Sequence, residues 1–144
     1  MRGGEPARTA VVDASVAVKW IIDEPGSDVA AALLERPIVW HAPRLMVVEV
    51  AAAIRRKVAG HELDVEVGLG AVAALLDAVR EGSVRLADDE ALVASALLLS
   101  IELSHKVPDC LYLALAEREG CPLSTTDARL ARLARARKVP LLSA

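Results

Sequence analysis

Four acidic residues lie inside or at the end of apolar segments, where a charge is costly to bury. They are Asp13, Glu49, Asp109 and Asp127, called here the acidic quartet. Glu49 is the most informative, because in a helix every residue three or four positions away on either side is Leu, Met or Ala. A carboxylate in such surroundings needs a proton, a cationic partner or a metal ion. The four residues together therefore predict a metal site built from carboxylates.

Three members of the acidic quartet also have a simpler interpretation. Asp109 and Asp127 stand at predicted helix starts, where an Asp side chain caps backbone N–H groups. Asp13 ends a predicted strand, and Ser15 could bond locally to the backbone there. Taken singly, capping is the stronger interpretation of Asp109 and Asp127. Glu49 has no such alternative, and the occurrence of all four favours the metal site.

The composition indicates a single globular domain. Of the 144 residues 54% are hydrophobic, nearly all of them Ala, Leu and Val, and Phe is absent. Such a chain has ample material for a core of helices packed through small side chains. Cys110 and Cys121 lie in apolar surroundings with no second pair, so the sequence predicts neither a disulfide framework nor a zinc knuckle. We expect a reduced, cytoplasmic setting.

Neither a membrane span nor an export signal is expected. The longest apolar stretch, 91–101, is well short of the ~20 residues that cross a bilayer. Residues 1–8 have no apolar core of the kind a signal peptide has, so we expect a flexible tail there and a single domain over 9–144. The net charge of −3 does not exclude RNA as a partner, because setting the acidic quartet aside leaves a net positive charge.

Short strands and helices alternate along the predicted chain, without repeats or linkers. This alternation predicts an α/β fold with a mainly parallel sheet covered on both faces. Ligands of such sheets bind beyond the carboxyl ends of the strands, where Asp13 and Asp127 are expected. The predicted strands span 9–13, 37–40, 84–86, 122–125 and 139–142, and the predicted helices span 16–22, 27–34, 43–58, 64–80, 89–103, 108–119 and 127–137.

Other charged residues carry weaker signals. The acidic run 88–90 and Asp64 are interpreted as helix caps. The basic runs at 55–57 and 129–138 could contact phosphates, but charge at helical spacing is more often a solvated helix face. The three histidines, His41, His61 and His105, lack the spacing of a ligand pair or a catalytic triad, so no chemistry is predicted for them.

Four ordered motifs resemble those of PIN-domain ribonucleases, specifically the VapC toxins of toxin–antitoxin modules. They are Val-Val-Asp-Ala-Ser-Val-Ala-Val-Lys-Trp at 11–20, Val-Glu-Val at 48–50 with Arg55-Arg56, Asp-Cys-Leu-Tyr-Leu-Ala-Leu-Ala at 109–116 and Leu-Ser-Thr-Thr-Asp-Ala-Arg-Leu at 123–130. The resemblance covers nearly the whole chain. It implies a PIN-like three-layer sandwich, with a mainly parallel central sheet flanked by helices.

The resemblance also implies roles for individual residues. The family's catalytic, metal-binding acids fall on the acidic quartet, and its hydroxyl residues near the site fall on Ser15 and Thr125. Two positions depart from the pattern. Ala52 stands where many relatives have Asn, and Pro108 stands where Tyr or Thr often precedes the third acid. Neither departure removes a carboxylate, but each alters the polarity beside one.

The implied activity is a toxic, Mg²⁺-dependent endoribonuclease that leaves a 5′-phosphate and a 3′-hydroxyl. Mg²⁺ prefers carboxylate oxygens and keeps several waters, which suits a quartet of Asp and Glu, and Mn²⁺ is an expected substitute. The substrate would be single-stranded or looped RNA, with tRNA or another structured RNA as candidates. The resemblance further implies a homodimer and a cognate VapB-like antitoxin that covers the acidic groove, with DNA contacted only through that antitoxin.

Two other functions compete with this one. A PIN-like scaffold that binds RNA or an antitoxin without cutting is conceivable because of Ala52. A phosphoacceptor domain resembling response regulators is suggested by Asp88-Asp89 and Lys106. In that class the acidic pair should end the first strand, and here it does not.

Overall fold

Four parallel strands form the central sheet of the computed structural model, which describes residues 8–143. Their order across the sheet is β3-β2-β1-β4, so β1 lies between two neighbours. The predicted tail lies outside the described residues, apart from Arg8, which begins β1. The strands are β1 (Arg8–Val12), β2 (Ile38–Pro43), β3 (Val84–Ala87) and β4 (Leu123–Ser124).

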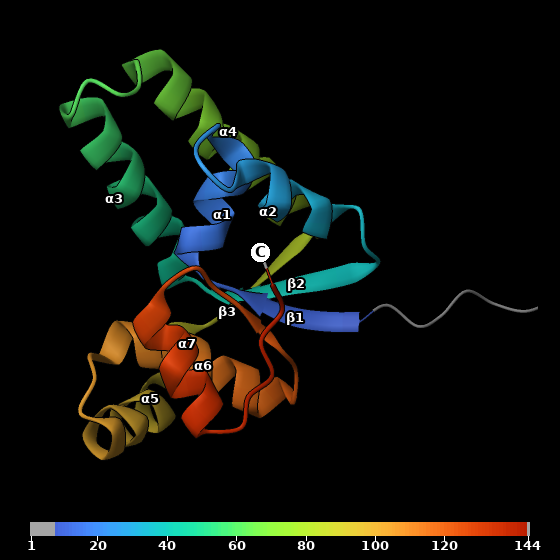
Figure 1. Cartoon of the computed structure of the whole chain (residues 1–144), viewed down its shortest axis with the longest axis vertical. Coiled ribbons are helices and arrows are strands. Elements are labelled where there is room, and N and C mark those ends of the chain that lie inside the picture. The colour runs from blue at the N-terminus through green and yellow to red at the C-terminus, as the bar shows by residue number, and fades with distance from the viewer. Residues whose placement is uncertain (1–7, 144) are drawn as a thin grey trace, which may run out of the picture.

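Helices cover both faces of this sheet (Figure 1). The first four pack with one another on one face, and the last three lie on the other, with α6 against β1, β2 and β4. The predicted three-layer α/β sandwich is therefore confirmed. The helices are α1 (Ala14–Ile21), α2 (Ser27–Leu34), α3 (Leu45–Ala59), α4 (Val65–Glu81), α5 (Asp89–Leu103), α6 (Val107–Glu119) and α7 (Ala128–Ala136).

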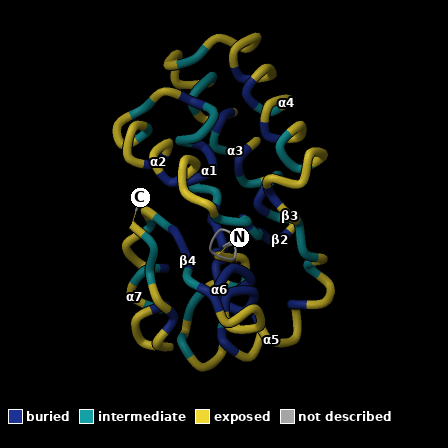
Figure 2. The backbone as a smooth tube through the Cα atoms, turned by 90° about the vertical axis from the view of Figure 1, so that its right-hand side faces the viewer, coloured by how far each residue is buried: buried dark blue, intermediate teal, exposed yellow. Residues whose placement is uncertain are grey.

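The core is built around β1 and α6. The last three residues of β1 are fully buried, and every residue of α6 from Asp109 to Ala116 is buried (Figure 2). A helix enclosed on all sides has no polar face to present to solvent, which explains the unbroken apolar run that follows Asp109. The same packing holds the amino end of α6 at the carboxyl edge of the sheet, close to the end of β1.

Two predicted elements were wrong. Residues 139–142 form no strand but a single bridge, Leu141 with Leu123. Pro140 has no N–H to donate to a ladder, and only its carbonyl takes part, accepting from Leu123 N–H at 2.9 Å. Pro43 is not in a helix either, since it ends β2 and pairs with Ala87. Because α3 begins at Leu45, Glu49 lies about one turn into that helix.

The outer face of α5 carries exposed apolar side chains. Val93, Leu97, Leu98 and Ile101 are each about half exposed or more. In the described part of the chain no single helix is long and apolar enough to cross a membrane. Helices α5 and α6 meet that test only as a pair, and they are bent by 113° at the break between them.

Two glycines inside α4 should respond differently to the same substitution. A Cβ at Gly70 would meet nothing within 4 Å, so Gly70→Ala should stabilise the helix by ~1 kcal/mol and raise the Tm by roughly 3 °C. A Cβ at Gly68 would lie 2.8 Å from Cγ2 of the buried Ile54, so Gly68→Ala should lose that gain to overlap between α3 and α4. Thermal unfolding of both variants, followed by circular dichroism, tests this difference. Equal Tm values would contradict it.

Candidate active site

Asp13 is held at the carboxyl end of β1 by several donors. Its Oδ1 accepts from the hydroxyl of Ser15 at 2.6 Å and from Val16 N–H at 3.2 Å, which makes Asp13 the N-cap of α1. Its Oδ2 accepts from the hydroxyl of Thr125 at 2.5 Å. Ser15 and Thr125, the two predicted hydroxyl residues, therefore fix both oxygens of this carboxylate.

The charge on Asp13 is nevertheless unfavourable. Its side chain is almost fully buried, and this burial raises the pKa of Asp13 from 3.8 to about 6. The hydrogen bonds from Ser15 and Thr125 lower the pKa but do not offset the loss of hydration, and the nearby charge of Asp127 raises it further. A group shifted in this way, in a cavity, is characteristic of functional sites.

Glu49 reaches from α3 toward α6. It accepts a hydrogen bond from the phenolic hydroxyl of the buried Tyr112. Partial burial raises the pKa of Glu49, and the charge of Asp109 adds to this, while the bond from Tyr112 works in the opposite direction. Glu49 is therefore not solvated on a helix face, and Tyr112 is a partner that the local sequence could not reveal, because it lies 63 residues away along the chain.

Asp109 does not cap its helix, so the capping interpretation was wrong for it. The N-cap of α6 is Lys106, and no side chain bonds to the backbone there. Instead, Oδ2 of Asp109 lies 2.6 Å from Nε2 of His105 and 3.8 Å from Nζ of Lys106. The sequence-based expectation that His105 has no role in chemistry missed this contact. The only signal was its position, four residues before an acid at a helix start.

Asp127 does cap α7, as the capping interpretation predicted. Its Oδ1 accepts from Arg129 N–H at 2.8 Å and from Leu130 N–H at 3.3 Å. Capping uses only one of its two carboxylate oxygens. Asp127 also lines the same cavity as the rest of the acidic quartet, so the two interpretations of this residue are compatible.

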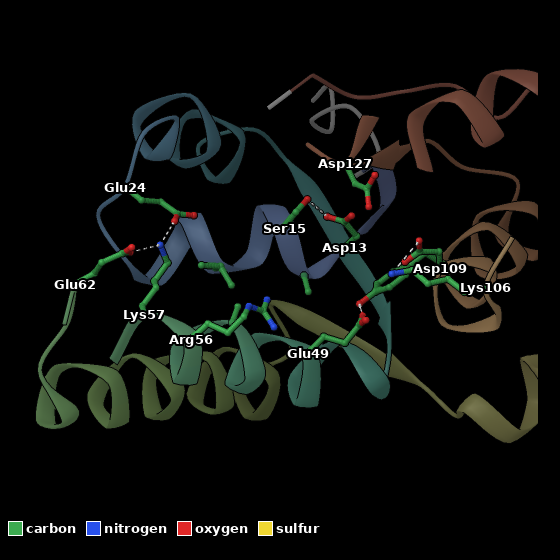
Figure 3. Close-up of a pocket in the computed structure, with 14 residues that line it drawn as sticks. Asp13, Ser15, Glu24, Glu49, Arg56, Lys57, Glu62, Lys106, Asp109 and Asp127 are labelled. Atoms are coloured by element: carbon green, nitrogen blue, oxygen red, sulfur yellow. Dashed lines mark hydrogen bonds and ion pairs between the residues drawn. The ribbon is translucent and has the colours of Figure 1, made fainter. Parts of the chain in front are cut away.

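One open cavity of about 490 Å³ joins these residues at the carboxyl edge of the sheet (Figure 3). All four members of the acidic quartet line it, although they come from the end of β1, from α3, from α6 and from the start of α7. Ala52 is exposed and does not line the cavity, whereas Ala53 does. Ala52 itself is therefore not part of the wall of the cavity.

The donor set suits a hard divalent cation. Carboxylate and hydroxyl oxygens are the ligands that Mg²⁺ and Mn²⁺ prefer. Across residues 8–143, however, no three His, Cys, Asp or Glu side chains stand close enough to enclose an ion as they are. Each acid is instead met by the local donors described above. The chemistry of the residues fits a metal ion, while their present positions are those of an acidic pocket satisfied by hydrogen bonds.

Comparison with known proteins decides the family. A family model of the PIN domain matches residues 10–136. The chain belongs to the PIN-domain family, among the VapC ribonucleases. It is 35% identical over 123 residues to Ribonuclease VapC12 of Mycobacterium tuberculosis, strains CDC 1551 / Oshkosh and H37Rv. That alignment covers 85% of this chain and 89% of the relative.

Solved structures of low sequence identity share the fold. PAE2754 from Pyrobaculum aerophilum superposes with a TM-score of 0.73 at 16% identity, covering 97% of this chain and 92% of its own. VapC20 of Mycobacterium tuberculosis, described as a sarcin-ricin loop cleaving toxin, superposes with a TM-score of 0.67 at 16% identity. The match covers 85% of this chain and 93% of VapC20. VapBC2 from Rickettsia felis, solved with a promoter DNA fragment, superposes with a TM-score of 0.65 at 14% identity. The match covers 94% of this chain and 98% of the matched chain.

The raised pKa of Asp13 predicts a pH-dependent cost to the stability of the ion-free protein. Because the folded-state pKa lies above the unfolded one, the favourable contribution of Asp13 is complete below about pH 4 and is lost as the pH rises through about 6. Asp13→Asn should therefore stabilise the protein in EDTA at pH 7.5. That gain should shrink by about 1.4 kcal/mol at pH 5, measured by urea unfolding at both values. A gain that does not change with pH would contradict the prediction.

Proposed function

We propose that this PIN domain is a metal-dependent endoribonuclease and the toxin component of a toxin–antitoxin module. It would hydrolyse phosphodiester bonds of RNA in the cytoplasm and leave a 5′-phosphate and a 3′-hydroxyl. The supporting observation is the convergence of four carboxylates from four separate segments on one open cavity, with Asp13 buried at a cost in hydration. Carboxylates brought together in this way are expensive unless a cation shares their charge.

In this proposal Asp13, Glu49 and Asp109 are the main metal ligands, and Asp127 binds a second ion or orients the attacking water. A bound Mg²⁺ or Mn²⁺ would activate that water and neutralise the charge that develops on the phosphate. The surrounding residues position these acids. Ser15 and Thr125 orient the carboxylate of Asp13. We propose that residues 9–144 form a single PIN domain.

Other side chains orient two of the proposed ligands. The hydroxyl of Tyr112 donates a hydrogen bond to Glu49, and Nε2 of His105 lies against a carboxylate oxygen of Asp109. These contacts hold Glu49 and Asp109 in place at the cavity, and their carboxylate oxygens are donors that a hard cation prefers.

The partners follow from the family. We propose a cognate VapB-like antitoxin that covers the acidic groove, consistent with the VapBC2 complex among the structural neighbours. A homodimer is proposed as well, supported by the exposed apolar side chains on α5. The proposed substrate is tRNA or another structured RNA, and VapC20 among the structural neighbours is described as cleaving the sarcin-ricin loop.

A scaffold that binds RNA or an antitoxin without cutting is the second candidate. The observation that favours it is the absence, within residues 8–143, of any three potential ligands positioned around one point. Metal affinity separates the two functions, because a scaffold has no need of a divalent ion. The next experiment therefore measures metal binding without relying on activity.

Mg²⁺ or Mn²⁺ should raise the Tm of the protein. Ligand at 100 times its Kd adds ~2.7 kcal/mol to the free energy of unfolding, which corresponds to several degrees for a chain of this length. Asp109→Asn should weaken this effect, whereas Asp64→Asn, which removes a carboxylate away from the cavity, should not. Thermal shift in EDTA and in each metal measures it. An unchanged Tm in both metals would contradict the proposed nuclease activity and favour the scaffold.

Antitoxin-free protein should cut total cellular RNA at discrete sites in Mg²⁺. Mapping of new 5′-phosphate ends identifies those sites without a guess about the target. The ends should disappear in EDTA and with Asp109→Asn, because both remove the metal centre. Binding of metal without any new ends would show that the domain is a scaffold.

A further inference from the structure

Arg56 extends from α3 into the cavity that holds the acidic quartet (Figure 3). Glu49, Ala53 and Arg56 occupy positions i, i+4 and i+7 of this helix, so they share one face, and all three line the cavity. At 1.5 Å per residue, Arg56 begins ~10 Å along the helix from Glu49. Ala53 between them has the smallest side chain that a helix favours, so this wall of the cavity is unobstructed.

The charge of Arg56 is not neutralised by a carboxylate. In the described part of the chain, no Asp or Glu oxygen lies within 4.0 Å of its guanidinium, whereas the adjacent Lys57 lies 2.5 Å from Oε2 of Glu24. Oε1 of the same glutamate bonds to Lys19 at 3.0 Å. Burial disfavours the charged form of Glu24, but these two lysines outweigh that effect and lower its pKa. Lys57 therefore belongs to an ion network at the far end of the cavity, and Arg56 remains available to a ligand.

A guanidinium beside a phosphodiesterase site suits a backbone phosphate. Its planar fork donates two parallel hydrogen bonds to phosphate oxygens. A strand whose reacting phosphate lies at the acidic quartet must continue along the cavity, and ~10 Å corresponds to about three nucleotides at the stacked spacing of 3.4 Å. We propose that Arg56 holds a backbone phosphate of the RNA strand a few nucleotides from the cleaved bond. This inference rests on the proposed function and names a binding residue for it.

An acidic segment of a protein partner is the other ligand that Arg56 could bind. Such a segment would have to approach along a wall that also carries Glu49, in a cavity that Asp109 lines as well. Both ligands would meet these carboxylates and the cation that they would hold. An RNA strand differs because it carries a phosphate at every nucleotide, so one phosphate can lie at the acidic quartet while another meets Arg56. The observations therefore favour a phosphodiester.

Substitution of Arg56 and of its neighbour Arg55 provides a matched test. Arg55 lines a separate apolar cavity between α3 and α4, so Arg55→Gln removes the same charge one residue away and outside the acidic cavity. Binding of a fluorescent single-stranded RNA of mixed sequence is followed by anisotropy in Mg²⁺ and in EDTA. Every protein carries Asp109→Asn so that nothing is cut.

Arg56→Gln should raise the Kd ~10-fold, because a charged hydrogen bond pair to phosphate is lost. It should also make the slope of log K against log salt shallower by about 0.7, the value of one phosphate contact with a single strand. Arg55→Gln should change neither quantity. Arg56→Lys should keep the slope, since it keeps the charge, but recover only part of the affinity. With Asp109 intact, Arg56→Gln should raise KM for RNA cleavage and leave kcat nearly unchanged.

Three results would overturn the inference. Equal losses in the two Gln variants would show a general effect of net charge, and unchanged RNA binding together with weaker binding of a purified antitoxin would assign Arg56 to a protein partner. If the KM of Arg56→Gln equals that of the unsubstituted protein, the RNA strand does not pass this residue. If the unsubstituted protein neither binds nor cuts RNA, the proposed function fails with it, whereas normal binding and cutting by Arg56→Gln would overturn this inference alone.

Discussion

The structure depends on the burial of one carboxylate at the end of the central strand. Asp13 follows β1, its own N–H bonds to Ser124 O at 3.1 Å, and its side chain begins α1. Because β1 is paired on both sides and α6 packs over it, this carboxylate is removed from water. The strand end, the helix start and the hydroxyls that serve Asp13 are therefore fixed together, and the site cannot form unless the sheet does.

The arrangement sets stability against function. Burial raises the pKa of Asp13 to about 6, so near neutral pH the ion-free protein keeps a charge that folding disfavours. The pKa of Glu49 is raised as well, and burial is the largest cause of the shift in both residues. Natural sites of this kind keep an unfavourable local group where it serves a ligand and are stabilised elsewhere. Here the fully buried α6 and the core around β1 contribute that stability.

The charged residues that α3 presents to the cavity have different partners. Glu49 meets Tyr112, Lys57 meets Glu24, and Arg56 lies between them without a carboxylate partner in the part of the chain that the structure describes. The cavity therefore has an acidic end, where a cation would be held, and a basic middle, where a strand would be bound. Opposite charges placed ~10 Å apart on one helix face can act on two different phosphates of the same strand.

The sequence by itself determined the fold class, the acidic quartet and most elements. Periodicity and turn residues are local signals, so α2, α5 and the alternation of strands and helices were predictable, and a buried acid in an apolar segment is visible wherever it occurs. The failures were at positions where pairing is non-local. Pro43 ends β2 because it pairs with Ala87, and 139–142 is no strand because Pro140 cannot extend a ladder.

Only the tertiary structure decided which groups meet. His105 contacts Asp109 because the chain turns between α5 and α6, and Tyr112 reaches Glu49 because α6 packs across the sheet from α3. Arg55 and Arg56 are indistinguishable in sequence, yet one faces the α3–α4 cavity and the other faces the acidic cavity. The two side chains point in different directions around α3, and which neighbour each direction meets is settled only when α3 packs against α1 and α4.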